Sequence, residues 1–145
     1  MHKRFHQWGF TLIELLVVIS IIGILIALGT ASYTTAQKKG RDAKRQADMK
    51  AVQDALDQYK SIHGQYPTNE DCSASDITEV LPAGFPTDPK DGTSYYLSCE
   101  ASTDTFCACA HLDQAGTGNA TNSDCEFGSD GDFFCTVNRM WYENN

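Results

Sequence analysis

Residues 9–14 read Gly-Phe-Thr-Leu-Ile-Glu and open the stretch of sequence that decides the fold. The next 23 residues, 15–37, carry no charge. A helix over residues 10–37 would be about 42 Å long at 1.5 Å per residue, which exceeds the roughly 30 Å hydrocarbon core of a bilayer. The sequence therefore predicts a helix that can span a membrane, with one carboxylate, Glu14, near its start.

Glu14 is costly in such a helix. A charged side chain in hydrocarbon costs roughly 2.5–3.5 kcal/mol on insertion scales. Its neighbours suggest that a partner for this charge comes from another copy of the chain. The alternative is a carboxylate that extends to the lipid headgroups.

Beyond Arg41 the pattern becomes amphipathic, with apolar side chains spaced three and four residues apart. We expect the buried stripe to comprise Ala43, Ala47, Ala51, Val52, Ala55, Leu56, Tyr59 and Ile62. His63 and Gly64 are typical of a helix end, and Pro67 prevents its continuation. We predict one helix from about Thr11 to about His63, whose second half packs on a globular head.

The head is acidic and rich in small polar residues. Residues 70–145 contain 14 acidic and two basic side chains, a formal net charge of −12. Such a surface repels nucleic acid, so a nucleic-acid partner is disfavoured. Candidate strands are 94–99, 105–112 and 132–137, with 139–142 a weaker fourth, after one helical turn at 76–81. They predict a small antiparallel sheet of three or four strands against the helix, an α+β fold.

Six cysteines, an even number, all lie in the head, which favours disulfides formed in an oxidising compartment. They are Cys72, Cys99, Cys107, Cys109, Cys125 and Cys135. Period two places Cys107, Cys109 and His111 on one face of a strand, where a bond between the two cysteines would be strained. Fifteen pairings are open; we prefer Cys125 with Cys135. A zinc site that includes Cys107, Cys109 and His111 is the alternative.

Two processing schemes fit the N-terminus. In an ordinary secretory signal, cleavage after Ala31 would release a disulfide-rich binding domain that begins at Ser32. In the other scheme, cleavage between Gly9 and Phe10 leaves the helix on the product. Glu14 argues against the first scheme, because a carboxylate at the edge of a signal's apolar region opposes insertion.

Residues 9–18 resemble the class III signal of type IV pilins and type II secretion pseudopilins. Residues 85–89 and 95–97 are similar, more weakly, to the loop and first strand of major pseudopilins. The resemblance implies cleavage by a prepilin peptidase after Gly9 and N-methylation of Phe10. It also implies that Glu14 of one subunit pairs with the Phe10 amine of the next. The expected organisation is a leader (1–9), a transmembrane and filament-core helix (10–37), an amphipathic helix (38–64) and a pilin-like head (65–145).

A Gly-rich loop near the C-terminus carries four carboxylates, those of Asp124, Glu126, Asp130 and Asp132. Carboxylates on a flexible loop suit calcium. Several major pseudopilins have a calcium site in this region, which the stretch 130–132 partly resembles. We expect a solvated acidic loop and no required cofactor, with calcium as the alternative.

Charge counting and the cysteines disagree on topology. Five basic residues within 38–45 outweigh Lys3 and Arg4, which by the positive-inside rule would place the head in the cytoplasm. Paired cysteines and the resemblance both place it outside. We expect a single-pass protein of the cytoplasmic membrane with its head outside, which then enters an extracytoplasmic filament.

The function expected from this resemblance is structural: a subunit of a type IV pilus-like filament that polymerises through its N-terminal helix. The alternative is the major pseudopilin of a type II secretion pseudopilus that drives protein export. The implied partners are further copies of the chain, a prepilin peptidase, an assembly ATPase with its inner-membrane platform, minor pilins, and membrane lipid before assembly. No catalytic motif is present, so we expect no enzymatic activity.

Overall fold

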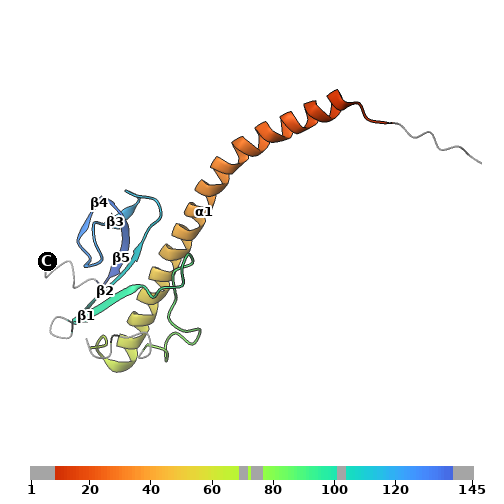
Figure 1. Cartoon of the computed structure of the whole chain (residues 1–145). Coiled ribbons are helices and arrows are strands. Elements are labelled where there is room, and N and C mark those ends of the chain that lie inside the picture. The colour runs from red at the N-terminus through yellow and green to blue at the C-terminus, as the bar shows by residue number, and fades with distance from the viewer. Residues whose placement is uncertain (1–8, 69–71, 73–76, 101–103, 139–145) are drawn as a thin grey trace, which may run out of the picture. The chain divides into compact units, whose positions relative to one another are not determined.

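The computed structural model describes residues 9–68, 72, 77–100 and 104–138, without the side chain of Ala31 (Figure 1). The chain divides into two compact units, Met1–Gln37 and Lys38–Asn145, and each is described by itself. The first unit contributes the beginning of the long helix α1. The second unit contains the rest of α1 and a five-stranded sheet.

Helix α1 runs over Leu12–His63, 52 residues, as predicted. Its start is defined by the Thr11 hydroxyl, which accepts a hydrogen bond from the Glu14 amide at 3.3 Å and so satisfies one of the free donors of the first turn. Its end is defined by Gly64, whose N–H donates to the Lys60 carbonyl at 2.7 Å. Gly64 has φ +85°, a left-handed conformation that glycine adopts without a Cβ clash.

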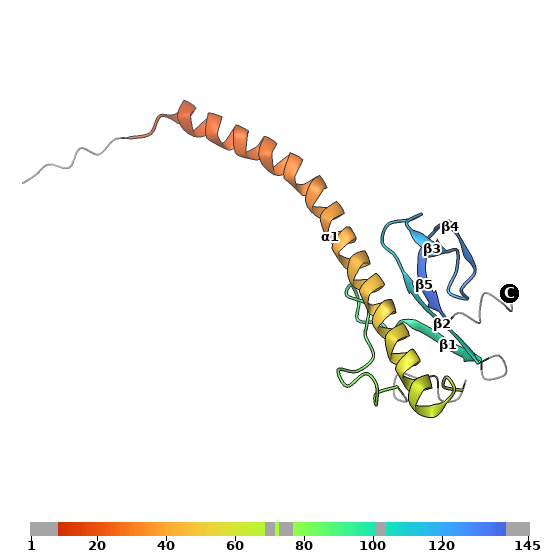
Figure 2. The ribbon, with the colours of Figure 1, turned by 180° about the vertical axis from the view of Figure 1, so that it is seen from behind.

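The sheet is antiparallel and has five strands, seen beside the second half of α1 in Figures 1 and 2. Its order is β1-β2-β5-β3-β4. The strands are β1 Tyr96–Glu100, β2 Thr105–His111, β3 Gly118–Ala120, β4 Phe127–Gly131 and β5 Phe133–Val137. Three of them match the predicted strands closely, and the α+β class is confirmed. The candidate strand 139–142 lies outside the described residues.

The prediction of three or four strands missed β3 and β4, which consist mainly of Gly, Asn, Ser and Asp. At two positions these strands lie too close to their neighbours in the sheet for ordinary side chains: Gly131 of β4 beside β3, and Gly118 of β3 beside β5. A Cβ added to Gly131 would lie 1.9 Å from the Ala120 carbonyl oxygen, and one added to Gly118 would lie 2.1 Å from that of Phe133. Glycine is therefore required at both positions. The predicted turn near 76–81 is present as an Ile77–Leu81 hydrogen bond of 3.0 Å, while Asp76 lies outside the described residues.

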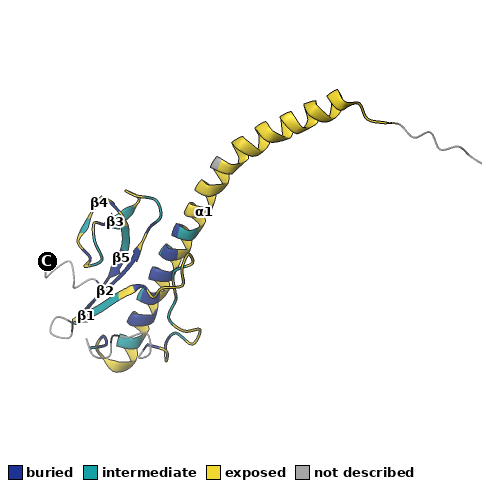
Figure 3. Cartoon of the chain, viewed as in Figure 1, coloured by how far each residue is buried: buried dark blue, intermediate teal, exposed yellow. Residues whose placement is uncertain are grey.

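One face of the sheet packs on the second half of α1 and forms the main core. Phe106, Ala108 and Ala110 of β2 lie there, as the period-two pattern predicted. From α1 the core takes Met49, Val52, Ala55 and Leu56. The prediction was wrong for Ala43, Ala47, Ala51 and Ile62, which are exposed. The buried face of the helix (Figure 3) passes instead through the charged residues Asp42, Arg45 and Asp48.

The opposite face of the sheet carries most of the cysteines. The disulfides are Cys72–Cys99, Cys107–Cys125 and Cys109–Cys135, and no cysteine is free. The preferred Cys125–Cys135 pairing was wrong. Antiparallel pairing of β2 with β5 places Cys109 directly opposite Cys135, so Cys125 bonds to Cys107. Cys107 and Cys109 are each part of a disulfide, so neither thiol is available as a ligand for the zinc alternative.

Candidate assembly segment and head anchor

The predicted processing site lies just outside helix α1. Gly9 and Phe10 are exposed and have no helical structure, and Phe10 is 83% exposed. The helix begins at Leu12, and its first backbone bond joins the Leu15 amide to the Thr11 carbonyl at 3.2 Å. Proteases act on exposed chain outside regular structure. The Gly9–Phe10 bond therefore lies where a peptidase can reach it without unwinding α1.

The described part of α1 in the first unit, Leu12–Gln37, is exposed along its length (Figure 3). Its large apolar side chains are 46–89% exposed. The most apolar window has a mean hydropathy of 2.8, which by length and composition suits a membrane span. The Ser20 and Thr30 hydroxyls donate to the helix's own carbonyls of Leu16 and Ala27, at 2.8 and 3.2 Å. The segment therefore presents an almost wholly apolar surface to lipid or to other helices.

Glu14 is exposed on the first turn of α1. Within the part of the chain that the structure describes, no basic side chain forms an ion pair with it. The N-terminal end of a helix favours a negative charge, which gives Glu14 partial compensation there. Its carboxylate remains available to a cation from outside this copy of the chain.

The second unit contains an ion cluster that the sequence analysis did not find. Arg45 of α1 has only 3% of its side chain exposed. Its Nε and Nη2 donate to the two Asp88 oxygens at 2.7 and 2.9 Å, and its Nη1 donates to Asp42 at 2.8 Å. A further oxygen, from Asp113, lies 3.3 Å from Nη1. Three carboxylates thus surround one guanidinium, and we call Asp42, Arg45, Asp88 and Asp113 the head anchor.

The contacts of the head anchor shift the pKa values of Arg45, Asp88 and Asp113. The hydrogen bond from Arg45 lowers the pKa of Asp88, against the opposing effect of burial. The hydrogen bond from Asp88 in turn raises the pKa of Arg45 above its ordinary value. Burial raises the pKa of Asp113, but a hydrogen bond from Arg41 and the nearby Arg45 charge outweigh it, so the net shift is downward. Arg45, Asp88 and Asp113 therefore remain charged at neutral pH.

The head anchor fastens two loops to α1. Asp42 accepts hydrogen bonds from the amides of Asp113 and Gln114, at 2.8 and 3.1 Å. Asp88 holds the 85–94 loop, whose own turn is closed by a 2.8 Å bond from the Asp88 amide to the Thr93 carbonyl. Two features of the sequence could have indicated this cluster. One is the pair of carboxylates at positions 42 and 48, three residues on either side of Arg45, and the other is the Pro-Thr-Asp-Pro loop at residues 86–89.

The four carboxylates predicted as a calcium alternative are exposed but not gathered. The Asp132 carboxylate accepts the Gly116 amide at 2.9 Å, and that of Glu126 accepts the Asn122 side-chain amide at 2.9 Å. Among the described residues, the only three potential ligand groups within 4.8 Å of one another are Cys107, Cys109 and Cys125. Calcium binds six to eight oxygens in proteins, and a calcium site stays the untested alternative to a solvated acidic loop.

The N-terminal part of the chain matches a known protein family. Residues 5–30 match the family model described as the prokaryotic N-terminal methylation motif. The chain is 37% identical over 92 residues to type II secretion system core protein G of Aeromonas hydrophila, covering 63% of this chain and 64% of that protein. It is 32% identical over 105 residues to the Pectobacterium carotovorum protein of the same name, covering 64% and 67%. No solved structure matches.

The chain belongs to the family of type IV pilins and type II secretion pseudopilins, which confirms the resemblance drawn from residues 9–18. The match spans about two thirds of the length of these two relatives. The protein of the same name from Pseudomonas aeruginosa matches over 48% of its length, at 38% identity.

Proposed function

We propose that this chain is a structural subunit of an extracytoplasmic filament, and specifically a major pseudopilin of a type II secretion system. The observation that carries the proposal is the first half of α1, which is apolar, exposed and interrupted by a single carboxylate. The printed names of the relatives favour the secretion filament over a type IV pilus. A structural role needs no catalytic group, and we propose no enzymatic activity.

The proposed assembly begins with cleavage after Gly9 by a prepilin peptidase and N-methylation of the new N-terminus at Phe10. This creates an ammonium group two residues before α1 begins. In a helical stack, the Glu14 carboxylate of one subunit pairs with the Phe10 ammonium of the next. Two ions that are each costly in an apolar environment then neutralise each other, and the pair fixes the axial register of the subunits.

The proposed location of the mature chain follows from α1 and the disulfides. Residues 10–37 hold the chain in the cytoplasmic membrane until an assembly ATPase and its membrane platform extract it into the filament. Three disulfides in the head suit an oxidising compartment outside the cytoplasm. Further copies of the chain and minor pilins are the proposed filament partners, and lipid is the partner before assembly.

The processing step is tested by the intact mass of the mature chain from its native cell. A chain that starts at Phe10 with one added methyl group and no free thiols is the expected result. A chain that starts at Ser32 would overturn the proposal, because the helix would have been removed. If cells without the chain lose surface fibres but still export proteins, the type IV pilus alternative replaces the secretion filament.

The charge pair is tested with Glu14→Gln, which retains the size of the side chain and removes its charge. The expected result is a processed, membrane-inserted chain that no longer enters filaments, measured as the sheared filament fraction. Ser20→Ala is the matched control on the same helix, since the Ser20 hydroxyl donates to the Leu16 carbonyl of that helix. Filaments of Glu14→Gln at the wild-type level would refute the pairing.

A further inference from the structure

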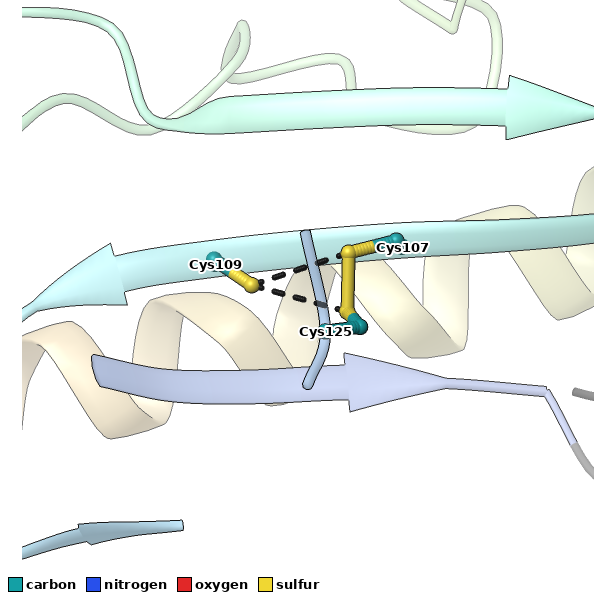
Figure 4. A group of neighbouring side chains, drawn as sticks. All are labelled: Cys107, Cys109 and Cys125. Atoms are coloured by element: carbon teal, nitrogen blue, oxygen red, sulfur yellow. Dashed lines mark hydrogen bonds between the residues drawn. A yellow bond between two sulfur atoms is a disulfide. The ribbon is translucent and has the colours of Figure 1, made fainter. Parts of the chain in front are cut away.

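Two disulfides on one face of the sheet lie in contact with each other, and Figure 4 shows the Cys107–Cys125 bridge with the sulfur of Cys109 beside it. Cys109 is bonded to Cys135, and its sulfur lies 3.5 Å from that of Cys125 and 3.6 Å from that of Cys107. Cys107 and Cys125 are themselves bonded to each other. All four cysteines are buried. Among the residues that the structure describes, Cys109 is therefore the one whose sulfur touches both sulfurs of the neighbouring bridge.

The contact is close but wrongly oriented for reaction. Thiol–disulfide exchange requires a thiolate to attack one sulfur with the other sulfur leaving on the far side. Cys109 lies almost equally far from both sulfurs of the Cys107–Cys125 bridge, so it meets that bond from the side. Its own bond to Cys135 prevents the side-chain rotation that would bring it into line. The Cys109–Cys135 bridge thus has two effects: the Cys109 sulfur cannot act as a nucleophile, and its orientation is fixed.

We propose that Cys109 is the centre of a disulfide-exchange site in the folded head, and that the Cys109–Cys135 bridge keeps this site inactive. The required co-reactant is a dithiol reductant. It gives two electrons to the Cys109–Cys135 bridge, which becomes two thiols, and is itself oxidised to a disulfide. Cys109, as thiolate, then attacks the Cys125 sulfur. A Cys109–Cys125 bond forms, the Cys107–Cys125 bond breaks, and Cys107 takes up the proton that Cys109 lost. One disulfide and two thiols are present before and after this step.

The same product is reached from the other side. If the Cys107–Cys125 bridge is opened, Cys125 becomes the thiolate and attacks the Cys109 sulfur. The Cys109–Cys125 bond forms, the Cys109–Cys135 bond breaks, and Cys135 takes up the proton. Run in reverse, these two steps convert a mispaired Cys109–Cys125 bridge into either native bridge without unfolding. The site therefore acts as a correction point for the pairing of the head.

The backbone of the site supports this movement. Cys107 and Cys109 lie on β2, between β1 and β5 in the sheet, and cannot shift far. Cys125 lies between β3 and β4, outside any strand, with φ +58°. The sulfurs of Cys109 and Cys125 need to approach only from 3.5 Å to a bond length of about 2.0 Å. A direct Cys107–Cys109 bond is disfavoured, because two residues of one strand are held near the limit of disulfide reach.

The experiment uses the full oxidised chain in detergent micelles with Cys135→Ser, which leaves Cys109 free without any reductant. The protein is held at about pH 8.5, where a substantial share of an ordinary thiol is thiolate, then quenched and digested with pepsin in acid. Peptide fragmentation between residues 107 and 109 locates each link. We expect the Cys107–Cys125 link to fall and the Cys109–Cys125 link to rise by the same amount, while wild type shows no change.

Cys107→Ser is the second arm and must give the same Cys109–Cys125 link at the expense of Cys109–Cys135. The matched control is Cys72→Ser, which frees Cys99 on the opposite face of the sheet, where it belongs to the other core cluster. Cys99 should acquire no new partner. If neither arm forms the Cys109–Cys125 link, the proposal is overturned. Links to Cys72 or Cys99 in either arm would show that the variant unfolds. Wild type treated with a limiting dithiol then decides: a Cys109–Cys125 link supports the proposal, and its absence overturns the proposal.

Discussion

We expect Arg45→Met to lower the free energy of unfolding of the head far more than a substitution of an exposed residue does. Arg45 donates two hydrogen bonds to Asp88 and one to Asp42. Hydrogen bonds to charged groups are each worth about 1.5–3 kcal/mol. Asp42 retains the two backbone amides, and Asp113 retains Arg41 and Lys90, so the loss falls mainly on Asp88. Removal of one partner from a buried ion pair costs about 3–5 kcal/mol, and we expect a loss of stability in this range.

The assay is thermal unfolding of the full chain in detergent, followed by near-ultraviolet circular dichroism of the head. For a domain of this size a loss of 3–5 kcal/mol lowers Tm by on the order of 12–40 °C. Lys50→Met is the matched control, because it also replaces a long cation of α1 with methionine but on the exposed side. It should change stability by less than about 0.5 kcal/mol.

A double-mutant cycle separates the ion pair from simple packing. Asp88→Asn removes the charge that Arg45→Met leaves without a partner, so the double variant should be more stable than the sum of the two losses predicts. Arg45→Lys retains a charge but not the two-pronged contact with Asp88, and should restore only part of the stability. If Arg45→Met behaves like Lys50→Met, or if the two changes are additive, the head anchor does not hold the 85–94 loop as argued.

Three further predictions concern the head. Asp88, Asp104 and Asp113 have pKa values lowered in the folded state, so their contribution to stability is complete above the ordinary carboxyl value of about 3.9 and is lost as pH falls through the lowered values; acid titration of unfolding that shows no loss below about pH 4 would contradict this. Gly131→Ala should cost more than about 1 kcal/mol, because its Cβ would meet the Ala120 carbonyl, while Gly128→Ala, with open space to 3.4 Å, should cost less in the same unfolding assay. Asn119→Ala removes both side-chain bonds to the Cys135 backbone, at 2.7 and 2.9 Å, and should cost about 1–3 kcal/mol and speed hydrogen exchange of the Cys135 amide; unchanged exchange would show that these bonds do not protect it.

The helix could be predicted from the sequence because its signals are local. An uncharged run of 23 residues and the Gly64 end follow from composition and backbone conformation alone. Strands β1, β2 and β5 could also be predicted, since their stretches contain aromatic, apolar and β-branched residues, with a period of two in β2. The alternation on β2 correctly divided Phe106 from Cys107 and thereby predicted the two faces of the sheet.

Strands β3 and β4 could not be predicted because their pairing depends on residues far apart in the sequence. Gly118 and Gly131 allow the backbones of neighbouring strands to lie close together. This requirement cannot be recognised before the pairing of the strands is known. The side-chain amide of Asn119 pairs with the Cys135 backbone in the place of a peptide group. By composition, these residues indicate a loop, and β propensity does not register such tertiary contacts.

The helix stripe was misjudged for a related reason. Alanines at 43, 47 and 51 fit a helical spacing, yet alanine is equally at home on an exposed helix surface. The face that is buried instead passes through Asp42, Arg45 and Asp48, which a hydropathy pattern counts as solvent-facing. Burial of these charges is possible because each has a partner. Arg45 bonds to Asp88 and Asp42, the amides of Asp113 and Gln114 donate to Asp42, and Lys44 and the Tyr95 hydroxyl bond to Asp48.

The two halves of α1 differ in what they contact. The first half exposes its apolar side chains, and the second half carries the head anchor and packs on the sheet. A head of this size has a small core and cannot rely on apolar burial alone. Its loops are held by an ion cluster and its sheet by three disulfides. None of these contacts uses a described side chain of Leu12–Gln37, so stabilising the head leaves the apolar surface of that segment free. A filament subunit that must pass from lipid to other helices needs that independence, because the same surface exchanges one apolar environment for another while the head stays folded.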